Sequence, residues 1–337
     1  MLLSSLLGFW LPVVSFGAPV QECRRLFERR EWRTFSNEEK IAYISSVKCL
    51  TAHHHERLSY TSSGILMPGS RSIYDDFALT HDMLEDFAHE NAYFLPWHRY
   101  FTYLFELALR DRCNYEGAFP YWDWSLDLFD MKSSPVFDPD LTSGLGTNGD
   151  CISTDCFIHD GAFGDVTLAY PIPHHLRRNI TFDDPATNRS LTDKLSAEHL
   201  FDIMRDTTGD FFTFQHRFSH VHNNLHFIIG GDMDSECPSK YPKEACDLTS
   251  FASNDPLFWL HHGQIDRIWS KWQSLHPDNF YAFQGYPLNT HNLSDSRYDP
   301  EASVSQKLDF DRLSTSVAVS QVFNHTAPPF CYVYVEH

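Results

Sequence analysis

The segment "FFTFQHRFSHVHNNLHFII" at residues 211–229 constrains the fold more than any other part of the chain. Because two glycines follow it directly, we predict one long helix that ends at Gly230. His222 and His226 are four residues apart, so their rings lie one turn apart on one helical face and can chelate a single metal ion. The apolar turn after His226 favours burial of this pair, and a metal would satisfy both buried rings.

A second pair on the same segment, His216 and His220, repeats this spacing on a face rotated away. Spacing alone does not decide between the two pairs, and two hydrogen-bonded core histidines remain the alternative for either. Asn223 stands where the H-E-x-x-H motif of zinc peptidases requires glutamate. The sequence therefore disfavours a zinc peptidase.

Three histidines in the first half of the chain have the spacing to form another set. His81 ends a predicted helix, "SIYDDFALTHDML", His89 lies in the connection "FAHENAYF", and His98 begins the predicted helix "PWHRYFTYLFELALRDRC". The three rings can converge only if the two helices pack as neighbours, which the short connection favours. Taken singly, each is read as a solvated or capping histidine, so the prediction rests on the three together.

Two adjacent histidines, His261 and His262 in "DPLFWLHHGQID", offer a third imidazole to the pair on residues 211–229. Neighbouring residues on a helix diverge by about 100°, so only one of the two can easily face the same ion. The other runs of adjacent histidines have no partner motif: His174-His175 and His53-His54-His55.

The remaining pattern indicates a mostly helical single domain, residues 19–337. Ser36 and Glu39 form a capping box for a helix in "FSNEEKIAYISSVKCL". The predicted apolar stripe of this helix is Ile41, Ile44, Val47 and Leu50. Residues 125–200 are rich in Pro, Gly, Asp and Asn and predict loops with short helices, while the tail "PPFCYVYVEH" alternates like an edge strand.

The net charge and the amino-terminal sequence indicate which partners to exclude and whether the protein is secreted. With 26 Lys and Arg against 45 Asp and Glu, the net charge of −19 repels phosphate backbones and anionic lipid, so we expect neither nucleic acid nor membrane as a partner. The apolar start "MLLSSLLGFWLPVVSFGAPV" is typical of a secretory signal peptide, residues 1–18. Four glycosylation sequons agree with a secreted protein: Asn179, Asn188, Asn292 and Asn324.

Eight cysteines, an even number, favour an oxidising compartment and disulfide bonds. Cysteine as a metal ligand needs short C-x-x-C spacings, and the sequence has none. Among the many possible connectivities we predict the pairs Cys151–Cys156, Cys237–Cys246, Cys49–Cys113 and Cys23–Cys331.

Two all-histidine sets suit copper better than a di-iron centre, which in helix bundles uses glutamate and Glu-x-x-His ligands. A single zinc ion on three histidines is the alternative for either set. "HENAYFLPWHRYFTYLFE" resembles the first copper signature of the tyrosinase family, and "HNNLH" with "NDPLFWLHHGQIDRIWSKWQ" resembles the second. "PYWDW" and the terminal "YVY" extend the resemblance to about residues 30–335.

The resemblance implies a mainly α fold: a four-helix bundle holding a dicopper centre, with extensive loops and few short strands. It implies two copper ions as cofactor, O2 as co-substrate, small phenolic substrates and no obligate protein partner. The implied ligands are His81, His89 and His98 for one copper and His222, His226 and His262 for the other. His262 is preferred to His261 because the family's ligand lies four residues before an aspartate, here Asp266.

Residues near the implied ligands carry further expectations. His261, Asn223, Asp266 and Glu106 are candidates for contact with the ligand histidines. Asp266 could orient an imidazole or pair with Arg99 or Arg267, and a structural ion pair is the alternative for both carboxylates.

The expected substrate follows from one departure from the family. Members that hydroxylate monophenols often carry a glutamate upstream of the first ligand on the second copper, and "FFTFQHRFSHV" has no carboxylate there. Gln215 is a neutral amide and cannot act as a carboxylate base. We therefore expect oxidation of o-diphenols or o-aminophenols to exceed hydroxylation of monophenols.

The sequence thus predicts a secreted type-3 copper oxidoreductase that forms o-quinones. A haemocyanin-like oxygen-binding protein without turnover is the alternative, and a metal-free relative is a third. The chain stops three residues after Tyr334 and so resembles short fungal-type members without a C-terminal shielding domain.

Overall fold

The computed structural model describes residues 22–54, 72–183, 187, 190–242, 246, 250–287 and 301–336. The predicted signal peptide, two of the four sequons (Asn188 and Asn292) and the last residue of the histidine triplet, His55, lie outside these described residues. The described part is mainly helical with few short strands, which confirms the predicted fold class.

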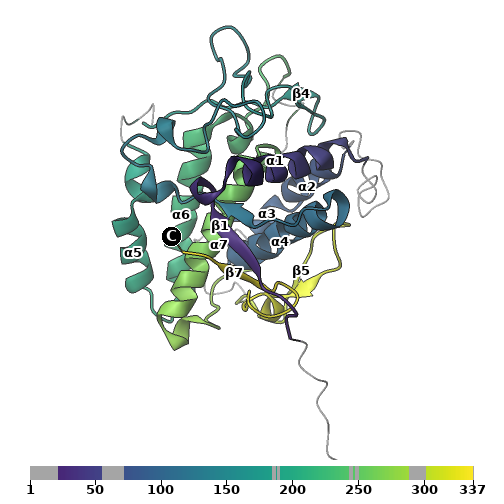
Figure 1. The fold of residues 1–337 in the computed structure, drawn as a ribbon. Coiled ribbons are helices and arrows are strands. Elements are labelled where there is room, and N and C mark those ends of the chain that lie inside the picture. The colour runs from purple at the N-terminus through teal and green to yellow at the C-terminus, as the bar shows by residue number, and fades with distance from the viewer. Residues whose placement is uncertain are drawn as a thin grey trace, which may run out of the picture.

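Seven α-helices lie within the described residues: α1 (Asn37–Ala52), α2 (Ile73–Met83), α3 (Glu85–Ala88), α4 (Phe94–Cys113), α5 (Ala197–Arg205), α6 (Phe211–Ile229) and α7 (Leu257–Leu275). The helices of the first half, α1 to α4, gather on one side of the molecule, and α5, α6 and α7 gather on the other (Figure 1). The predicted segment 211–229 is α6 from its first residue to its last.

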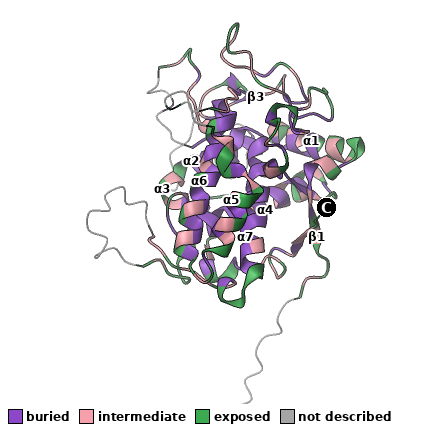
Figure 2. Cartoon of the chain, turned by 90° about the vertical axis from the view of Figure 1, so that its left-hand side faces the viewer, coloured by how far each residue is buried: buried purple, intermediate pink, exposed green. Residues whose placement is uncertain are grey.

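The bundle that carries the histidines consists of α2, α4, α6 and α7. Helix α4 packs along both α1 and α7. Between α4 and α7 the rings of Phe105 and Trp259 stack at 3.6 Å, and Phe77 of α2 meets both rings edge-on. Buried residues run through this helical interior (Figure 2), so aromatic packing holds the helices at fixed separations.

Helix ends follow local chemistry. The predicted capping box at Ser36 and Glu39 is present, but the predicted stripe of α1 is wrong at one position, because Ile41 is 38% exposed while Ile44, Val47 and Leu50 are buried. Gly230 ends α6 with φ +61°, and a Cβ there would lie 2.7 Å from the carbonyl oxygen of Asn179. Only glycine fits that turn, which stops the helix four residues after His226.

The strands are short. Parallel strands β1 (Phe27–Glu31), β2 (Phe119–Tyr121) and β7 (Tyr332–Tyr334) form one sheet in the order β2-β1-β7. The tail is therefore an edge strand, as predicted. The other strands form two antiparallel pairs, β3 (Thr167–Leu168) with β4 (His174–His175) and β5 (Lys307–Leu308) with β6 (Val317–Ala318).

Of the predicted loop region 125–200, the described residues up to 196 are mostly loops and 3₁₀ turns, and the short helix α5 begins at Ala197. The 3₁₀ helices of the described residues are Trp32–Thr34, Trp124–Leu126, Met131–Ser133, Thr192–Leu195, Gly231–Asp234, Ala252–Asn254, Pro277–Asn279 and Val319–Gln321. All four predicted disulfides are present: Cys23–Cys331, Cys49–Cys113, Cys151–Cys156 and Cys237–Cys246. A bilayer crossing needs a long apolar helix, and no helix among the described residues meets that requirement.

Candidate metal centre

The first histidine set converges as the short connection predicted. His81 lies in the last turn of α2, His98 lies in α4, and His89 ends the short helix α3 between them. The ring centroid of His89 lies 4.9 Å from that of His81 and 4.8 Å from that of His98. Three imidazoles from three helices therefore share one small volume.

Hydrogen bonds fix how the rings of this set are turned. Nδ1 of His81 lies 2.6 Å from the carbonyl oxygen of Ser250, and Nδ1 of His98 lies 2.8 Å from that of Phe94. A carbonyl only accepts, so each Nδ1 carries the hydrogen and each Nε2 presents a lone pair. These two Nε2 atoms lie 3.3 Å apart.

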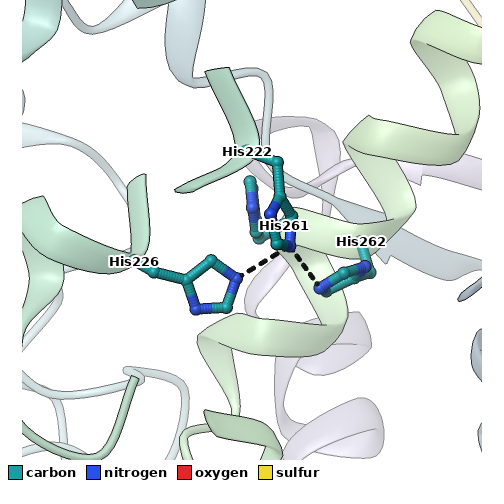
Figure 3. Close-up of side chains that lie close together, drawn as sticks. All are labelled: His222, His226, His261 and His262. Carbon is teal, nitrogen blue, oxygen red and sulfur yellow. Dashed lines mark hydrogen bonds between the residues drawn. The ribbon is translucent and has the colours of Figure 1, made fainter. Parts of the chain in front are cut away.

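The second set has the same arrangement (Figure 3). Nε2 of His222 on α6 lies 3.0 Å from Nε2 of His226 and 3.3 Å from Nε2 of His262 on α7. Nδ1 of His226 donates to the carbonyl oxygen of Met233, at 2.6 Å. Nδ1 of His222 lies 2.8 Å from Oδ1 of Asn223, so the predicted contact between Asn223 and a histidine of this set is present.

Five of these rings are uncharged: His81, His98, His222, His226 and His262. Burial lowers the pKa of His81 to about 3 and that of His226 to about 4, and it holds the pKa values of His98, His222 and His262 well below the ordinary value. The Nε2 lone pairs of His81 and His98 face each other at 3.3 Å, and those of His222 and His226 at 3.0 Å, and such neutral nitrogens repel unless a cation lies between them. An all-imidazole donor set suits copper, zinc, iron or nickel, so the residues present fit a metal.

The two sets lie against each other. The ring of His98 stacks on that of His262 with centroids 4.4 Å apart, and the ring of His89 lies 6.1 Å from that of His222. The two sets thus border one shared space. This adjacency favours a pair of ions over the single zinc ion that either set alone would explain.

Both rings of the doublet lie near the pair on α6. The nearest ring nitrogens of His222, His226, His261 and His262 all lie within 4.8 Å of one another. Nδ1 of His261 accepts from the indole nitrogen of Trp124 at 3.3 Å, whereas His262 stacks on His98. His262 is thus the ring that faces the other set, which supports the predicted choice, and its role as a ligand stays a prediction.

A cavity of about 150 Å³ opens onto the histidines. Its lining includes His89, His222 and His226, the side chains of Asn223 and Phe227, and the carboxylates Glu85 and Asp234. Phe227 is 51% exposed, so the cavity reaches the surface along α6. The volume is of the order that seats one aromatic ring.

Sequence analysis missed both carboxylates of this cavity. Glu85 lies 2.8 Å from Nδ1 of His89, one turn earlier in the chain, a spacing that could have indicated it. Asp234 follows the turn at Gly230, and no local sequence pattern indicates that it lines the cavity. Burial and the charge of Glu236 raise the pKa of Asp234 to about 7, and no described residue forms a hydrogen bond or ion pair with its carboxylate.

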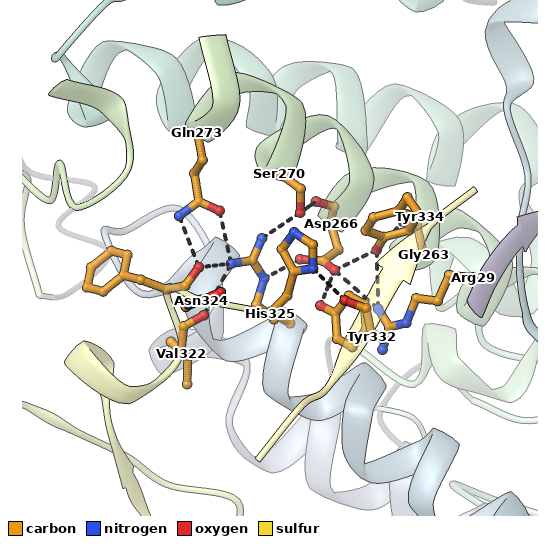
Figure 4. Close-up of polar contacts among 12 residues, drawn as sticks. Arg29, Gly263, Asp266, Ser270, Gln273, Val322, Asn324, His325, Tyr332 and Tyr334 are labelled. Atoms are coloured by element: carbon orange, nitrogen blue, oxygen red, sulfur yellow. Dashed lines mark hydrogen bonds and ion pairs between the residues drawn. The ribbon is translucent and has the colours of Figure 1, made fainter. Parts of the chain in front are cut away.

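Asp266 does not orient an imidazole. Its carboxylate accepts from Arg99 and Arg29 and from the phenol groups of Tyr332 and Tyr334 (Figure 4). The predicted pairing with Arg99 is present, and the pairing with Arg267 is wrong. Because Arg267 points instead to Asp123 at 3.0 Å, it lies outside this network.

Glu106 likewise forms ion pairs, at 2.9 Å with Arg29 and at 2.8 Å with Arg110. No contact joins it to a described histidine of either set. For Glu106 and Asp266, the structural ion pair is therefore the correct alternative.

The other histidine runs are used elsewhere. His174 contacts Asp232 at 3.2 Å, and His175 is exposed. His53 lies near Cys49 and Cys113, whose sulfurs are bonded to each other. The described sequon residues, Asn179 and Asn324, are partly exposed, and their glycosylation stays a prediction.

Comparison with known proteins agrees with this geometry. The family description "Common central domain of tyrosinase" matches residues 71–275. The tyrosinase-like protein phomQ1 of Diaporthe leptostromiformis is 30% identical over 98% of this chain and 84% of its own length. The N-acetyl-6-hydroxytryptophan oxidase ivoB of Emericella nidulans is 28% identical over 99% of each chain.

Solved structures agree as well. A mutant polyphenol oxidase from Thermothelomyces thermophila has a TM-score of 0.68 at 26% identity, covering 92% of this chain and 89% of that one. The Grenache (Vitis vinifera) polyphenol oxidase, at 17% identity and a TM-score of 0.51, covers 97% of this chain and 90% of its own and shows the shared fold. Since the family description covers more than half of the residues, this chain belongs to the tyrosinase family.

Proposed function

We propose that the protein is a secreted dicopper oxidase that converts o-diphenols to o-quinones, or similar o-aminophenols to o-quinone imines, with O2. The observation that carries the proposal is the adjacency of two histidine sets, in each of which Nε2 lone pairs face each other. His81, His89 and His98 would hold one copper, and His222, His226 and His262 would hold the other. When bound, a copper pair supplies the electron exchange with O2.

The electron count is that of a polyphenol oxidase. Each diphenol gives up two electrons and two protons and becomes a quinone. One O2 accepts the four electrons and four protons of two diphenols and becomes two waters. The protein has to seat the ring, keep the ligand nitrogens turned inward and receive protons.

Residues of the chain support each of these tasks. Carbonyls of Ser250, Phe94 and Met233 hold three ligand rings so that Nε2 faces the shared space. The ring of Phe258 lies 4.1 Å from that of His262 and excludes water from that side. The apolar side chain of Phe227 and the carboxylate of Asp234 line the cavity, one to contact a ring and the other to accept a proton.

The substrate preference rests on what α6 presents to the cavity. Gln215 is buried, carries no charge and does not line the cavity, so α6 contributes the amide of Asn223 rather than a carboxylate. This supports o-diphenols over monophenols. The relative named N-acetyl-6-hydroxytryptophan oxidase extends the proposed class to other hydroxylated aromatic rings.

Secretion is part of the proposal. Four disulfides in the described residues are typical of an oxidising compartment. Sequencing the amino terminus of the mature protein tests it, and we expect the first residue near Ala18. A mature protein that begins at Met1 would contradict the proposed signal peptide.

An oxygen-consumption panel tests the activity. Copper-loaded protein is given a catechol, an o-aminophenol and a monophenol, and quinone absorbance is followed with 4-tert-butylcatechol. We expect steady quinone formation, fastest with the first two substrates, and none with His262→Ala. Oxygen binding without quinone would instead indicate a carrier, and equal rates with the monophenol would contradict the substrate preference.

A further inference from the structure

The pair His216 and His220 on α6 is not used by the proposed dicopper centre. Both side chains are exposed, and their ring centroids lie 5.1 Å apart with the ring planes 75° to each other. On a helix, residues four apart lie on one face, so both rings can turn a nitrogen toward one ion. The pair is therefore a second chelating unit on the same helix, at the surface.

Neighbouring side chains pack against one ring of the pair and place charges near the other. Phe212 stacks on His216 with parallel planes at 6.1 Å, which limits the rotation of that ring. Charges of both signs lie near His220, and the positive charge of Lys194 acts on its ring more strongly than the negative charge of Glu90. Among divalent first-row ions, a nitrogen site binds Cu²⁺ most tightly.

The position of the pair on α6 places it close to the cavity. Phe212, His216, His220, Asn223 and Phe227 follow one another at steps of four, four, three and four residues, which keeps them on one helical face. Asn223 and Phe227 line the cavity above the buried histidines. The exposed pair therefore ends one helical turn from the mouth of that cavity.

The buried ligands need a route for their metal. His222 and His226 are 3% and 9% exposed, and His81 and His262 are covered almost completely. An ion that reaches them must lose its water shell and pass through a cavity of about 150 Å³. A surface chelate at the mouth would replace water by imidazole before entry, and ligand exchange along α6 needs no redox step and no extra reactant.

We propose that His216 and His220 form an exposed copper-binding site that receives Cu²⁺ and passes it into the buried centre. The binding step stands on the geometry of the pair alone. The transfer step rests on the proposed function, because it requires a buried copper centre.

Equilibrium dialysis of the full chain against buffered Cu²⁺, followed by a brief chelator wash, tests the binding step. We expect one exchangeable copper in addition to the chelator-resistant ions, with nitrogen hyperfine structure in its electron paramagnetic resonance spectrum. Because two imidazoles on one face act as a chelate, either His216→Ala or His220→Ala should weaken it on the order of a hundredfold, nearly as much as the double variant. His159→Ala, at an exposed histidine outside the pair, is the matched control.

Persistence of the exchangeable copper and its nitrogen signal in the double variant would overturn the site. Thermal melting of the metal-free variants checks that they are folded, which we expect because both side chains are exposed. If the wild type held no chelator-resistant copper, the dicopper proposal would fail, but loss of the exchangeable ion in the variants would still establish the surface site.

A loading experiment tests the transfer step. Metal-free protein is mixed with limiting buffered Cu²⁺, and chelator-resistant copper is measured over time. We expect the double variant to load on the order of ten times more slowly than wild type, and to reach the same copper content and turnover once copper is in excess. Equal loading rates would show that the pair binds copper without passing it on.

Discussion

Helices α4 and α7 each contribute to two buried polar clusters that differ in kind. His98 and Arg99 are neighbours on α4, and His262 and Asp266 lie one turn apart on α7. The histidines meet on one side, where neutral nitrogens face neutral nitrogens at 3.3 Å. The charged residues meet on the other side, where Arg99 and Asp266 pair directly and Asp266 also accepts from Arg29.

The two clusters differ in whether protein groups alone satisfy their charges and hydrogen bonds. Arg99 also donates to Ser270, Gln273 and the carbonyl oxygen of Phe323, so its charge and its hydrogens are satisfied by protein. Despite burial, Arg99 and Arg29 lower the pKa of Asp266 to about 2. A cluster closed in this way needs no further partner, whereas a cluster of facing lone pairs requires a ligand from outside.

Replacing a residue of the histidine cluster should have the largest effect. We expect His262→Ala to lose one of the two coppers and all measurable turnover, because the ring that faces the other set is removed. His261→Ala is the matched control and should keep both coppers and part of the activity, since His261 is held by Trp124. Metal analysis and quinone formation measure both. Reversed phenotypes would place the ligand one residue earlier.

Replacing a residue of the charged cluster should affect stability rather than copper. Asp266→Ala leaves Arg99 buried without a carboxylate and Arg29 with Glu106 alone, which we expect to lower the free energy of unfolding by about 3–5 kcal/mol. Denaturant unfolding of the metal-free protein measures this, and copper content below the melting temperature should stay at the wild-type value.

The exposed pair Arg205–Asp206 is the control for this variant. Asp206→Ala should leave the free energy of unfolding nearly unchanged, because solvent screens an exposed ion pair. Loss of copper from folded Asp266→Ala at low temperature would show that the two clusters are coupled, contrary to the comparison.

Binding of copper should satisfy the histidine cluster and stabilise the fold. At a free copper concentration a hundredfold above Kd, each site should stabilise the fold by about 2.7 kcal/mol. Thermal melting with and without copper measures this gain. The gain should shrink in His262→Ala and persist in Asp266→Ala, and a gain of equal size in both variants would argue against the assigned ligands.

The smallest expected effect concerns Asp234, the carboxylate without a protein partner in the described residues. Its pKa of about 7 in the folded protein lies above the ordinary value, so ionisation opposes folding as pH rises above about 4 and does so fully above about 7. Asp234→Asn should therefore stabilise the metal-free protein at pH 8, on the order of 1 kcal/mol after solvent screening, and should have little effect at pH 4.

Glu236→Gln sharpens this test. Removing the neighbouring charge should lower the pKa of Asp234 and move the pH dependence toward acid. Unfolding measured from pH 4 to 8 records the midpoint, and a stability difference that does not vary with pH would show that Asp234 is already solvated.

Much of the fold could be predicted because its signals are local. The capping box at Ser36, the glycine after residue 229 and the four-residue spacing of His222 and His226 each report on a single helix. Where a prediction failed, tertiary contacts decided the outcome. Ile41 has the right periodicity for the core, but the described residues leave it 38% exposed. Arg267 has a nearby acid on its own helix, yet it pairs with Asp123 from the segment after β2.

The sequence alone therefore indicated the helices α1, α2, α4, α6 and α7, the two close disulfide pairs and the spacing of the histidines, because periodicity and short cysteine spacings lie within short stretches of chain. Only the tertiary structure decided that the two histidine sets adjoin, that Asp266 belongs to an ion network, and that Asp234 lines the cavity. Each of these depends on residues brought together from distant segments. The packing of α4 against α7 sets the distance between the two histidine sets.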